Sequence, residues 1–371
     1  MLKKLFLYSL ATASILSALA GCGATTAAPK DVAPAETAGS TSVAQVDADT
    51  KEGGIKVAMV INRLGDMGFN DEAFAGLKKA GEDFEVEYNY VECPQSSEAE
   101  TQMRMLADTE EYALILVVGA DRKDAVEAVA EDYPDQKFSL IDSVVADMPN
   151  LHGVASRDPE QTFLSGVIAG LVTKDERMEL ANSENVIGFV GGMDSPASRA
   201  GAAGFLSGVK YVNPEAELIY TIVGSYQDPG KAKEIALTAY GRGADIVSHN
   251  CGASGMGVFS AAEEVNRYVI GSSKATVDQA RSLCTSIKKT DLFVYQEIES
   301  ILNGTWEAGS TRKGIKEGVC DYDTEGLDTQ LPEDMIEIVE DIKKKVSDGE
   351  LSLPEEPDAI DEWLKTNQYG K

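Results

Sequence analysis

KVAMVINRLGDMGFNDEAFAGL, residues 56–77, is the most informative segment for the fold class, because its apolar periodicity changes from that of a strand to that of a helix. Lys56 to Ile61 is a short apolar run typical of a strand covered on both faces, whereas Phe74, Leu77 and Ala80 recur at near-helical spacing. In a parallel sheet such a turn lies at the carboxyl edge, where helix starts and polar side chains converge on ligands. We therefore expect this turn to face a ligand.

The turn itself carries the side chains expected at a binding corner. Asp66, Asn70 and Asp71 supply polar groups, and Phe69 supplies a ring. The alternative interpretation is local: Asn70 or Asp71 caps the helix, and Phe69 packs inward.

Strand-like and helix-like runs alternate along residues 56–155 and again along residues 186–271. Repeated units of this length indicate parallel, doubly wound sheets, and 371 residues exceed what one core usually holds. The predicted fold class is α/β with two lobes, each a doubly wound parallel sheet flanked by helices, and a ligand cleft between them. The expected strands are 56–61, 86–91, 114–118, 138–141, 151–155, 186–190, 218–223, 245–247 and 268–270, and a surface helix is expected at 332–347.

The N-terminus resembles the signal of a bacterial lipoprotein. Lys3 and Lys4 precede an apolar run that ends in LAGC at Cys22, which matches a lipobox. We expect a signal peptide at 1–21, lipidation of Cys22 and a disordered tether over 22–54, since that segment is polar, Ala- and Pro-rich and aperiodic. An ordinary signal peptide with a chance cysteine is the alternative. The expected location is the extracytoplasmic face of the cell membrane, with the protein anchored by lipid.

Composition excludes several function classes. The chain has 33 basic and 62 acidic residues, a surface that repels nucleic acid. The cysteines after Cys22 are widely spaced, so no zinc site is expected, and both one disulfide and free buried thiols stay open. The cysteines in question are Cys93, Cys251, Cys284 and Cys320.

The sequence offers no catalytic pattern. It has two histidines, neither beside an obvious nucleophile, and it lacks a P-loop and a GxSxG elbow. The GASGMG segment does not have dinucleotide-binding spacing, so Gly252 and Gly255 are interpreted as points of close backbone approach to a ligand. We predict no enzymatic activity, no cofactor and no metal.

Ten ordered motifs resemble the basic membrane protein family. They include GDMGFNDEAF, LILVVG, FLSGVIAGLVTK, IGFVGGMDSP, VGSYQDPGKAKEIA, GASGMGV and TSIKKTD, and they cover roughly Ile55 to Cys320. Characterised members of that family are lipid-anchored substrate-binding proteins of ABC importers, mostly for purine nucleosides. The resemblance therefore implies a small nucleoside-like solute and ABC permease subunits as partners, with the receptor a monomer.

The resemblance also implies a domain arrangement. The fold would be a two-lobed type I periplasmic-binding fold whose chain crosses between the lobes three times. Lobe 1 would hold 55–155 plus 284–320, lobe 2 would hold 156–283, and a helical C-terminal extension would hold 321–371.

The binding residues that the resemblance implies lie on both lobes. Lys288, in the TSIKKTD motif, would hydrogen-bond ligand hydroxyls; without the resemblance it reads as a solvated lysine at a helix start. The full set of predicted ligand-binding residues is Asp66, Phe69, Asn70, Gly119, Gly252, Gly255, Ser273 and Lys288.

Two positions depart from the family pattern. Ser273 stands where an Asp usually binds the ribose, with Asp278 as an alternative carboxylate, and Gly201 stands where an aromatic residue is usual. These departures leave open an importer receptor for a solute other than a nucleoside. A membrane-tethered receptor that reports to a signalling partner is a separate alternative.

Overall fold

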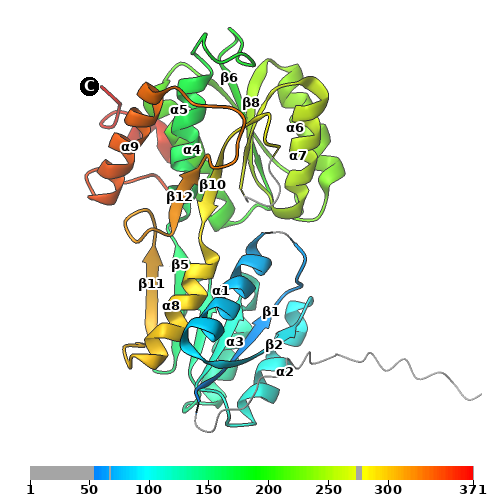
Figure 1. Ribbon diagram of the computed structural model, residues 1–371, viewed down its shortest axis with the longest axis vertical. Coiled ribbons are helices and arrows are strands. Elements are labelled where there is room, and N and C mark those ends of the chain that lie inside the picture. The colour runs from blue at the N-terminus through cyan, green and yellow to red at the C-terminus, as the bar shows by residue number, and fades with distance from the viewer. Residues whose placement is uncertain (1–53, 67, 273–277, 371) are drawn as a thin grey trace, which may run out of the picture. The chain divides into compact units, whose positions relative to one another are not determined.

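The computed structural model describes residues 54–66, 68–272 and 278–370, and Figure 1 shows their arrangement in two α/β lobes, each built on its own sheet. The expected signal peptide at 1–21, the expected lipidation site Cys22, the expected tether up to residue 53, and Ser273 lie outside these residues. Among the described residues, no helix is long and apolar enough to cross a membrane.

Lobe 1 is built on a sheet of six parallel strands in the order β11-β5-β4-β3-β1-β2. Helices α1 and α8 pack together, as do α2 and α3. The strands are β1 (Lys56–Ile61), β2 (Glu87–Glu92), β3 (Leu114–Val118), β4 (Phe138–Ile141), β5 (Leu151–Ser156) and β11 (Gly309–Lys313). The helices are α1 (Phe69–Phe84), α2 (Ser96–Ala107), α3 (Lys123–Asp132) and α8 (Thr290–Leu302), with a short η1 (Ala120–Arg122).

The alternation of β1 explains why this lobe has helices on both faces. Val57 and Met59 are buried in one apolar cluster, which includes Leu77 of α1, while Ala58 and Val60 are buried in another. A strand that is apolar at five successive positions, Val57 to Ile61, needs cover on both sides, as the sequence predicted.

Lobe 2 repeats the plan in the order β12-β10-β9-β8-β6-β7, with only β12 antiparallel. Its strands are β6 (Val186–Gly191), β7 (Glu217–Ile222), β8 (Ala244–Asn250), β9 (Tyr268–Gly271), β10 (Ser282–Lys288) and β12 (Cys320–Asp323). Its helices are α4 (Asp158–Val172), α5 (Pro196–Val212), α6 (Pro229–Gly241), α7 (Gly255–Val265), α9 (Glu333–Ser347) and α10 (Ile360–Trp363), with η2 (Gly252–Ser254) and η4 (Pro357–Ala359).

Proline fixes where three of these helices begin. Pro159, Pro196 and Pro229 occupy the first turns of α4, α5 and α6, where a missing N–H costs nothing. The α6 start is completed by Asp228, whose carboxylate accepts a 2.9 Å hydrogen bond from the Lys231 amide. The loops that precede these helices are therefore held in place at the sheet edge.

Each expected strand coincides with a strand of the structure, but β10, β11 and β12 were not expected. The β11 sequence, GSTRK, is polar and lies in a glycine-rich region, so it has none of the apolar alternation that indicates a strand. It is nevertheless paired with β5 through five residues. Tertiary pairing, rather than local propensity, makes it a strand.

The pairing of β10 and β12 corrects two of the expected lobe boundaries. Both strands belong to the second sheet, so the chain returns to lobe 1 after Lys288 rather than near 284, and it leaves lobe 1 after Lys313 rather than at 320. The three crossings implied by the resemblance are present, after β5, β10 and β11. Sequence periodicity does not say which sheet a strand joins, and the hydrogen-bond partners decide it.

Helices α4 and α5 approach closely because glycines line their contact. A Cβ atom at Gly204 would lie 2.1 Å from the carbonyl oxygen of Pro159, and one at Gly208 would lie 2.2 Å from that of Phe163. Both obstacles are backbone atoms, which cannot swing aside as a side chain can.

We expect Gly204→Ala to lower the free energy of unfolding by about 1–3 kcal/mol, because the helices must separate to admit the methyl group. Urea denaturation monitored by circular dichroism measures the change. The control is Gly241→Ala, since a Cβ at this last residue of α6 meets nothing within 4 Å. An equal loss of stability in both variants would contradict the packing argument.

Candidate ligand-binding site

The strand orders place the binding loops. Both sheets contain the doubly wound pattern in which the first strand of the lobe lies between the second and third strands, namely β2-β1-β3 in lobe 1 and β7-β6-β8 in lobe 2. In such sheets the chain connections diverge between the first and third strands, and ligands bind at the carboxyl ends there. The corresponding loops follow β1 and β3 in lobe 1, and β6 and β8 in lobe 2.

Glycines with left-handed backbones occupy two of these loops. Gly119 follows β3 with φ 108°, and Gly252 follows β8 with φ 58°. Both were predicted site residues, and the structure places them at the divergence points of their sheets. Other side chains would strain these turns, because only glycine adopts such angles freely.

An ion pair links the two lobes. Lys288 is the last residue of β10 in lobe 2, and Asp142 directly follows β4 in lobe 1. The Lys288 Nζ lies 3.0 Å from each carboxylate oxygen of Asp142, and the two side chains are only 15% and 22% exposed. The solvated helix-start interpretation of Lys288 is therefore wrong: the residue ends a strand, and its ammonium group is paired.

The electrostatics keep this lysine charged. Burial on its own lowers the pKa of Lys288, but the negative charges of Asp142 and Asp158 outweigh burial and raise the pKa above its usual value. Asp142 itself has φ 71°, a left-handed conformation that is uncommon for a residue other than glycine. Backbone conformations of this kind cluster at functional sites, where the surrounding structure maintains them.

The charge of a second carboxylate acts on the same ammonium group. Asp158, at the start of α4, accepts a 2.6 Å hydrogen bond from the Ser156 hydroxyl. Burial raises the pKa of Asp158, and Asp142 raises it further, while Lys288 lowers it. Two carboxylates and one ammonium group therefore form a half-buried cluster of hydrogen-bond donors and acceptors. Asp142 was not among the predicted site residues, although its position directly after the expected strand at 138–141, at a carboxyl edge, was a usable signal.

The predicted turn after β1 meets the ion pair through Phe69. The Phe69 ring centroid lies 5.4 Å from Lys288 Nζ, a cation–π distance, and the ring is only partly buried. The alternative in which Phe69 simply packs inward is thus incomplete, since the ring also contacts the charged centre.

Asp66 organises the turn that carries this ring. Its carboxylate accepts hydrogen bonds from the amides of Gly68, Asn70 and Asp71 and from the Asn70 side chain. The helix is therefore capped from Asp66 rather than from Asn70 or Asp71. The Asn70 Oδ1 atom is buried and has no hydrogen-bond partner within the described chain, so it is available as an acceptor.

Gly255 plays a packing role. A Cβ atom there would lie 2.2 Å from the ring of His249, which is buried and meets Phe259 edge-on. Burial lowers the pKa of His249 to about 4, so this ring is neutral at pH 7. The structure thus places Gly255 against the histidine that supports the loop after β8.

The two departures from the family pattern have different outcomes. Ser273 lies outside the described residues. Asp278, considered as its substitute, is paired with Arg281 at 2.8 Å. At Gly201 a Cβ atom would lie 3.1 Å from the Asn250 side-chain nitrogen, so the space beside α5 is occupied by an amide at the end of β8.

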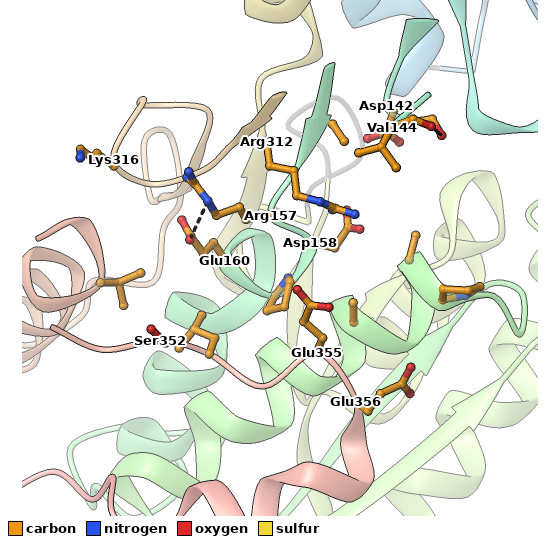
Figure 2. Close-up of a pocket in the computed structure, with 18 of the residues that line it drawn as sticks. Asp142, Val144, Arg157, Asp158, Glu160, Arg312, Lys316, Ser352, Glu355 and Glu356 are labelled. Atoms are coloured by element: carbon orange, nitrogen blue, oxygen red, sulfur yellow. Dashed lines mark hydrogen bonds and ion pairs between the residues drawn. The ribbon is translucent and has the colours of Figure 1, made fainter. Parts of the chain in front are cut away.

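A cavity of about 770 Å³ shares Asp142 and Asp158 with the charged cluster (Figure 2). Its other walls come from the crossing segments around Arg157 and Arg312, the start of α5 at Ser195, and the C-terminal residues 346–356. The predicted residues that the structure describes do not line this cavity; Lys288 is joined to it through Asp142. The C-terminal wall was not foreseen, because nothing in its acidic sequence indicates that it folds over a cavity.

The remaining expectations concern cysteine and metal. Cys93, Cys251, Cys284 and Cys320 are all buried and free, which resolves the choice between a disulfide and thiols. Within residues 54–66, 68–272 and 278–370, no cluster of His, Cys, Asp or Glu has the arrangement of a metal site.

Comparison with known proteins gives one consistent picture. The family model described as "ABC transporter substrate-binding protein PnrA-like" (Bmp) matches residues 55–356. A nucleoside-binding ABC transporter protein, BmpA, from Lactococcus lactis is 29% identical and covers 81% of this chain and 89% of its own. A CD4+ T-cell-stimulating antigen of Listeria innocua is 30% identical over 81% of this chain and 88% of its own.

Two further matches concern location and fold. A lipoprotein of Pyrococcus abyssi is 28% identical over 78% of each chain. The crystal structure of an ABC transporter solute-binding protein from Aeropyrum pernix superposes with a TM-score of 0.72 at 25% identity, covering 84% of this chain and 96% of the other. This chain therefore belongs to the Bmp family of PnrA-like substrate-binding proteins of ABC transporters.

Proposed function

We propose that the protein is the lipid-anchored, extracytoplasmic receptor of an ABC importer for a purine nucleoside or a related nucleobase compound. The observation that carries the proposal is the Lys288–Asp142 pair between the lobes, next to the Phe69 ring. A charged donor and acceptor beside an aromatic face match a molecule that has hydroxyl groups at one end and a flat ring at the other.

The chemistry of the pair suits a ribose. Each of two neighbouring hydroxyl groups donates one hydrogen bond, which Asp142 accepts, and each oxygen accepts one, which Lys288 donates. The partly buried setting strengthens these bonds, because water competes less for them. Phe69 then offers its face to the base.

Binding couples to lobe movement because the pair belongs to both lobes. A ligand that contacts Asp142 on lobe 1 and Lys288 on lobe 2 stabilises the arrangement in which both contacts are made. The permease subunits recognise that arrangement and receive the solute. The ligand thereby increases the population of molecules in which both contacts are made, and no chemical step is involved.

A ligand panel tests the proposed class. The full chain, purified in mild detergent and partially unfolded to release carried solute, is screened by thermal shift against nucleosides, nucleobases, sugars and amino acids. A cognate nucleoside at about a hundred times its Kd stabilises the fold by roughly 2.7 kcal/mol and raises Tm by a few degrees. A shift with amino acids or simple sugars only would exclude the nucleoside class.

Lys288→Met tests the charged pair. We expect nucleoside affinity measured by calorimetry to fall roughly 30-fold or more, because the ligand loses a charged donor and Asp142 loses its counter-ion. Asp142→Asn, which retains the shape, should also weaken binding.

The matched control is Lys343→Met, which removes another partly buried lysine, paired with Asp321 at 2.8 Å on the same lobe. Its affinity should equal that of the wild type. Unchanged nucleoside affinity in Lys288→Met would show that the Lys288–Asp142 pair is not part of the binding site.

Cys22→Ser tests the anchor. We expect the wild-type protein to incorporate labelled palmitate and to sediment with membranes, whereas the variant should do neither, because the cysteine thiol is the lipid attachment point. Retention of the label in the variant would place the lipid elsewhere.

A further inference from the structure

The second crossing between the lobes is short, and hydrogen bonds hold it from two sides. Lys288 ends β10 in lobe 2 and Thr290 begins α8 in lobe 1, so Lys289 alone separates them. The Lys289 amide donates a 2.9 Å hydrogen bond to the carbonyl of Val319, which lies in the third crossing. On the other side, the Thr290 amide donates to the carboxylate of Glu72, in the first turn of α1. A side chain of α1 therefore binds the backbone next to Lys288.

The contact with Glu72 takes the place of a local cap on α8. The N-cap residue Lys289 makes no side-chain cap hydrogen bond, and the Thr290 hydroxyl is buried without a partner among the described residues. The first amides of a helix have no partner within the helix, so they bind other groups or water. Glu72 supplies such a group, and the start of α8 is therefore positioned by α1 rather than by its own side chains.

The packing of α1 on α8 fixes the position of Glu72. The two helices lie side by side (Figure 1), and a Cβ atom at Gly76 would lie 2.3 Å from the carbonyl oxygen of Asp291. Glu72 lies on the same face of α1 as Gly76, because residues four apart in a helix share a face. The missing side chain at Gly76 therefore brings Glu72 against the first turn of α8.

The surroundings of Glu72 oppose its negative charge. Burial, together with the charges of Asp291 and Asp66, raises the pKa of Glu72 to about 7. The charge of Lys288 and the hydrogen bond from the Thr290 amide act in the opposite direction and lower the pKa. These groups come from α8, from the turn after β1 and from the end of β10. Glu72 therefore gains or loses its proton near neutral pH, beside the crossing.

An ionised Glu72 reduces the stability of the fold. A carboxyl group whose pKa is higher in the folded chain contributes stability that is fully present below its unfolded pKa of about 4.3. That contribution is lost as the pH rises through about 7, the pKa of Glu72 in the folded chain. A glutamine of the same shape would avoid the loss, because it carries no charge. Residues that reduce stability in this way are typical of functional positions.

We propose that Glu72 is a positioning residue of the ligand site, whose carboxylate fixes the second crossing and thereby sets where the Lys288 ammonium group meets the ligand. This inference rests on the proposed function and adds a dependence of affinity on pH. The ionised carboxylate binds the Thr290 amide more strongly than a neutral carboxyl group does, because charge-assisted hydrogen bonds are the stronger ones. Lys288 is therefore held most firmly when Glu72 is ionised.

The test compares Glu72→Gln with the wild type at two pH values. Inosine is titrated into both full-length proteins by calorimetry at about pH 8 and at about pH 5.5, above and below the pKa of Glu72. At the higher pH the variant should bind inosine about fivefold more weakly, because it keeps the hydrogen-bond acceptor and loses the charge. At the lower pH the two affinities should agree within about twofold, because the protonated carboxyl group of the wild type is also neutral.

Two further variants isolate the contribution of Glu72. Glu72→Leu removes the acceptor as well as the charge, so it should bind inosine more weakly than Glu72→Gln at both pH values. Glu82→Gln changes an exposed glutamate of the same helix and should follow the wild type throughout. The pKa of Asp158 is also raised by burial, so a pH dependence common to the wild type and Glu72→Gln belongs to other groups such as Asp158. Only the difference between these two proteins reports on Glu72.

Thermal unfolding separates positioning from damage to the fold. At about pH 8, Glu72→Gln should have a higher Tm than the wild type, because the ionised carboxylate destabilises the folded chain. The difference should shrink as the pH falls below about 6, because the wild-type carboxyl group is then protonated. A lower Tm together with a lower affinity in Glu72→Gln would assign Glu72 a structural role and overturn the proposal.

Hydrogen exchange tests the crossing without any ligand. At about pH 8, the peptide that contains the Thr290 amide should exchange faster in Glu72→Gln than in the wild type, because the weaker hydrogen bond opens more often. Equal exchange, or equal inosine affinity at this pH, overturns the positioning role and leaves the nucleoside receptor standing. Failure of the wild type to bind any nucleoside overturns the proposed ligand class, and the exchange rates then decide the role of Glu72.

Discussion

The ion pair between Lys288 and Asp142 is the contact on which the proposed binding site depends, because it joins the last residue of a lobe 2 strand to the residue after a lobe 1 strand. A charge that is 15% exposed requires a partner, and here the partner belongs to the other lobe. A ligand that inserts its own hydroxyl groups satisfies both charges at once. The free energy of pairing these two charges therefore depends on how the two lobes are placed relative to each other.

The topology of the two sheets explains how one ion pair can connect both lobes. Both sheets repeat the same strand order, so their carboxyl edges present equivalent loops, and three chain crossings connect the lobes. Proline starts such as Pro159, Pro196 and Pro229 fix the helices behind these loops. Regular elements therefore hold the side chains, and in the proposed function the crossings would absorb the movement of the lobes.

The candidate site residues differ in how they can be identified: some from the sequence around them, and others only from the packing of distant segments. Asp66, Asn70 and Phe69 were predictable, because a strand-to-helix change of period identifies their turn without reference to distant residues. Asp158 was not predicted as a site residue, since only packing brings the start of α4 into the electrostatic field of Lys288 and Asp142. Lys288 was predicted from a family motif, yet its place at the end of β10 rather than at a helix start required the structure.

The alternation of strands and helices, the two-lobed class and the strand-to-helix turn at residues 62–70 follow from the amino-acid sequence alone, because apolar periodicity and turn residues act locally. Three features became known only from the tertiary structure: β11 pairs with β5, β10 belongs to lobe 2, and residues 346–356 form a wall of the cavity. The partner of β11 and the walls of the cavity come from segments more than a hundred residues apart, and the partners of β10 are two separate strands, β9 and β12. Local pattern carries no information about which segments become such partners.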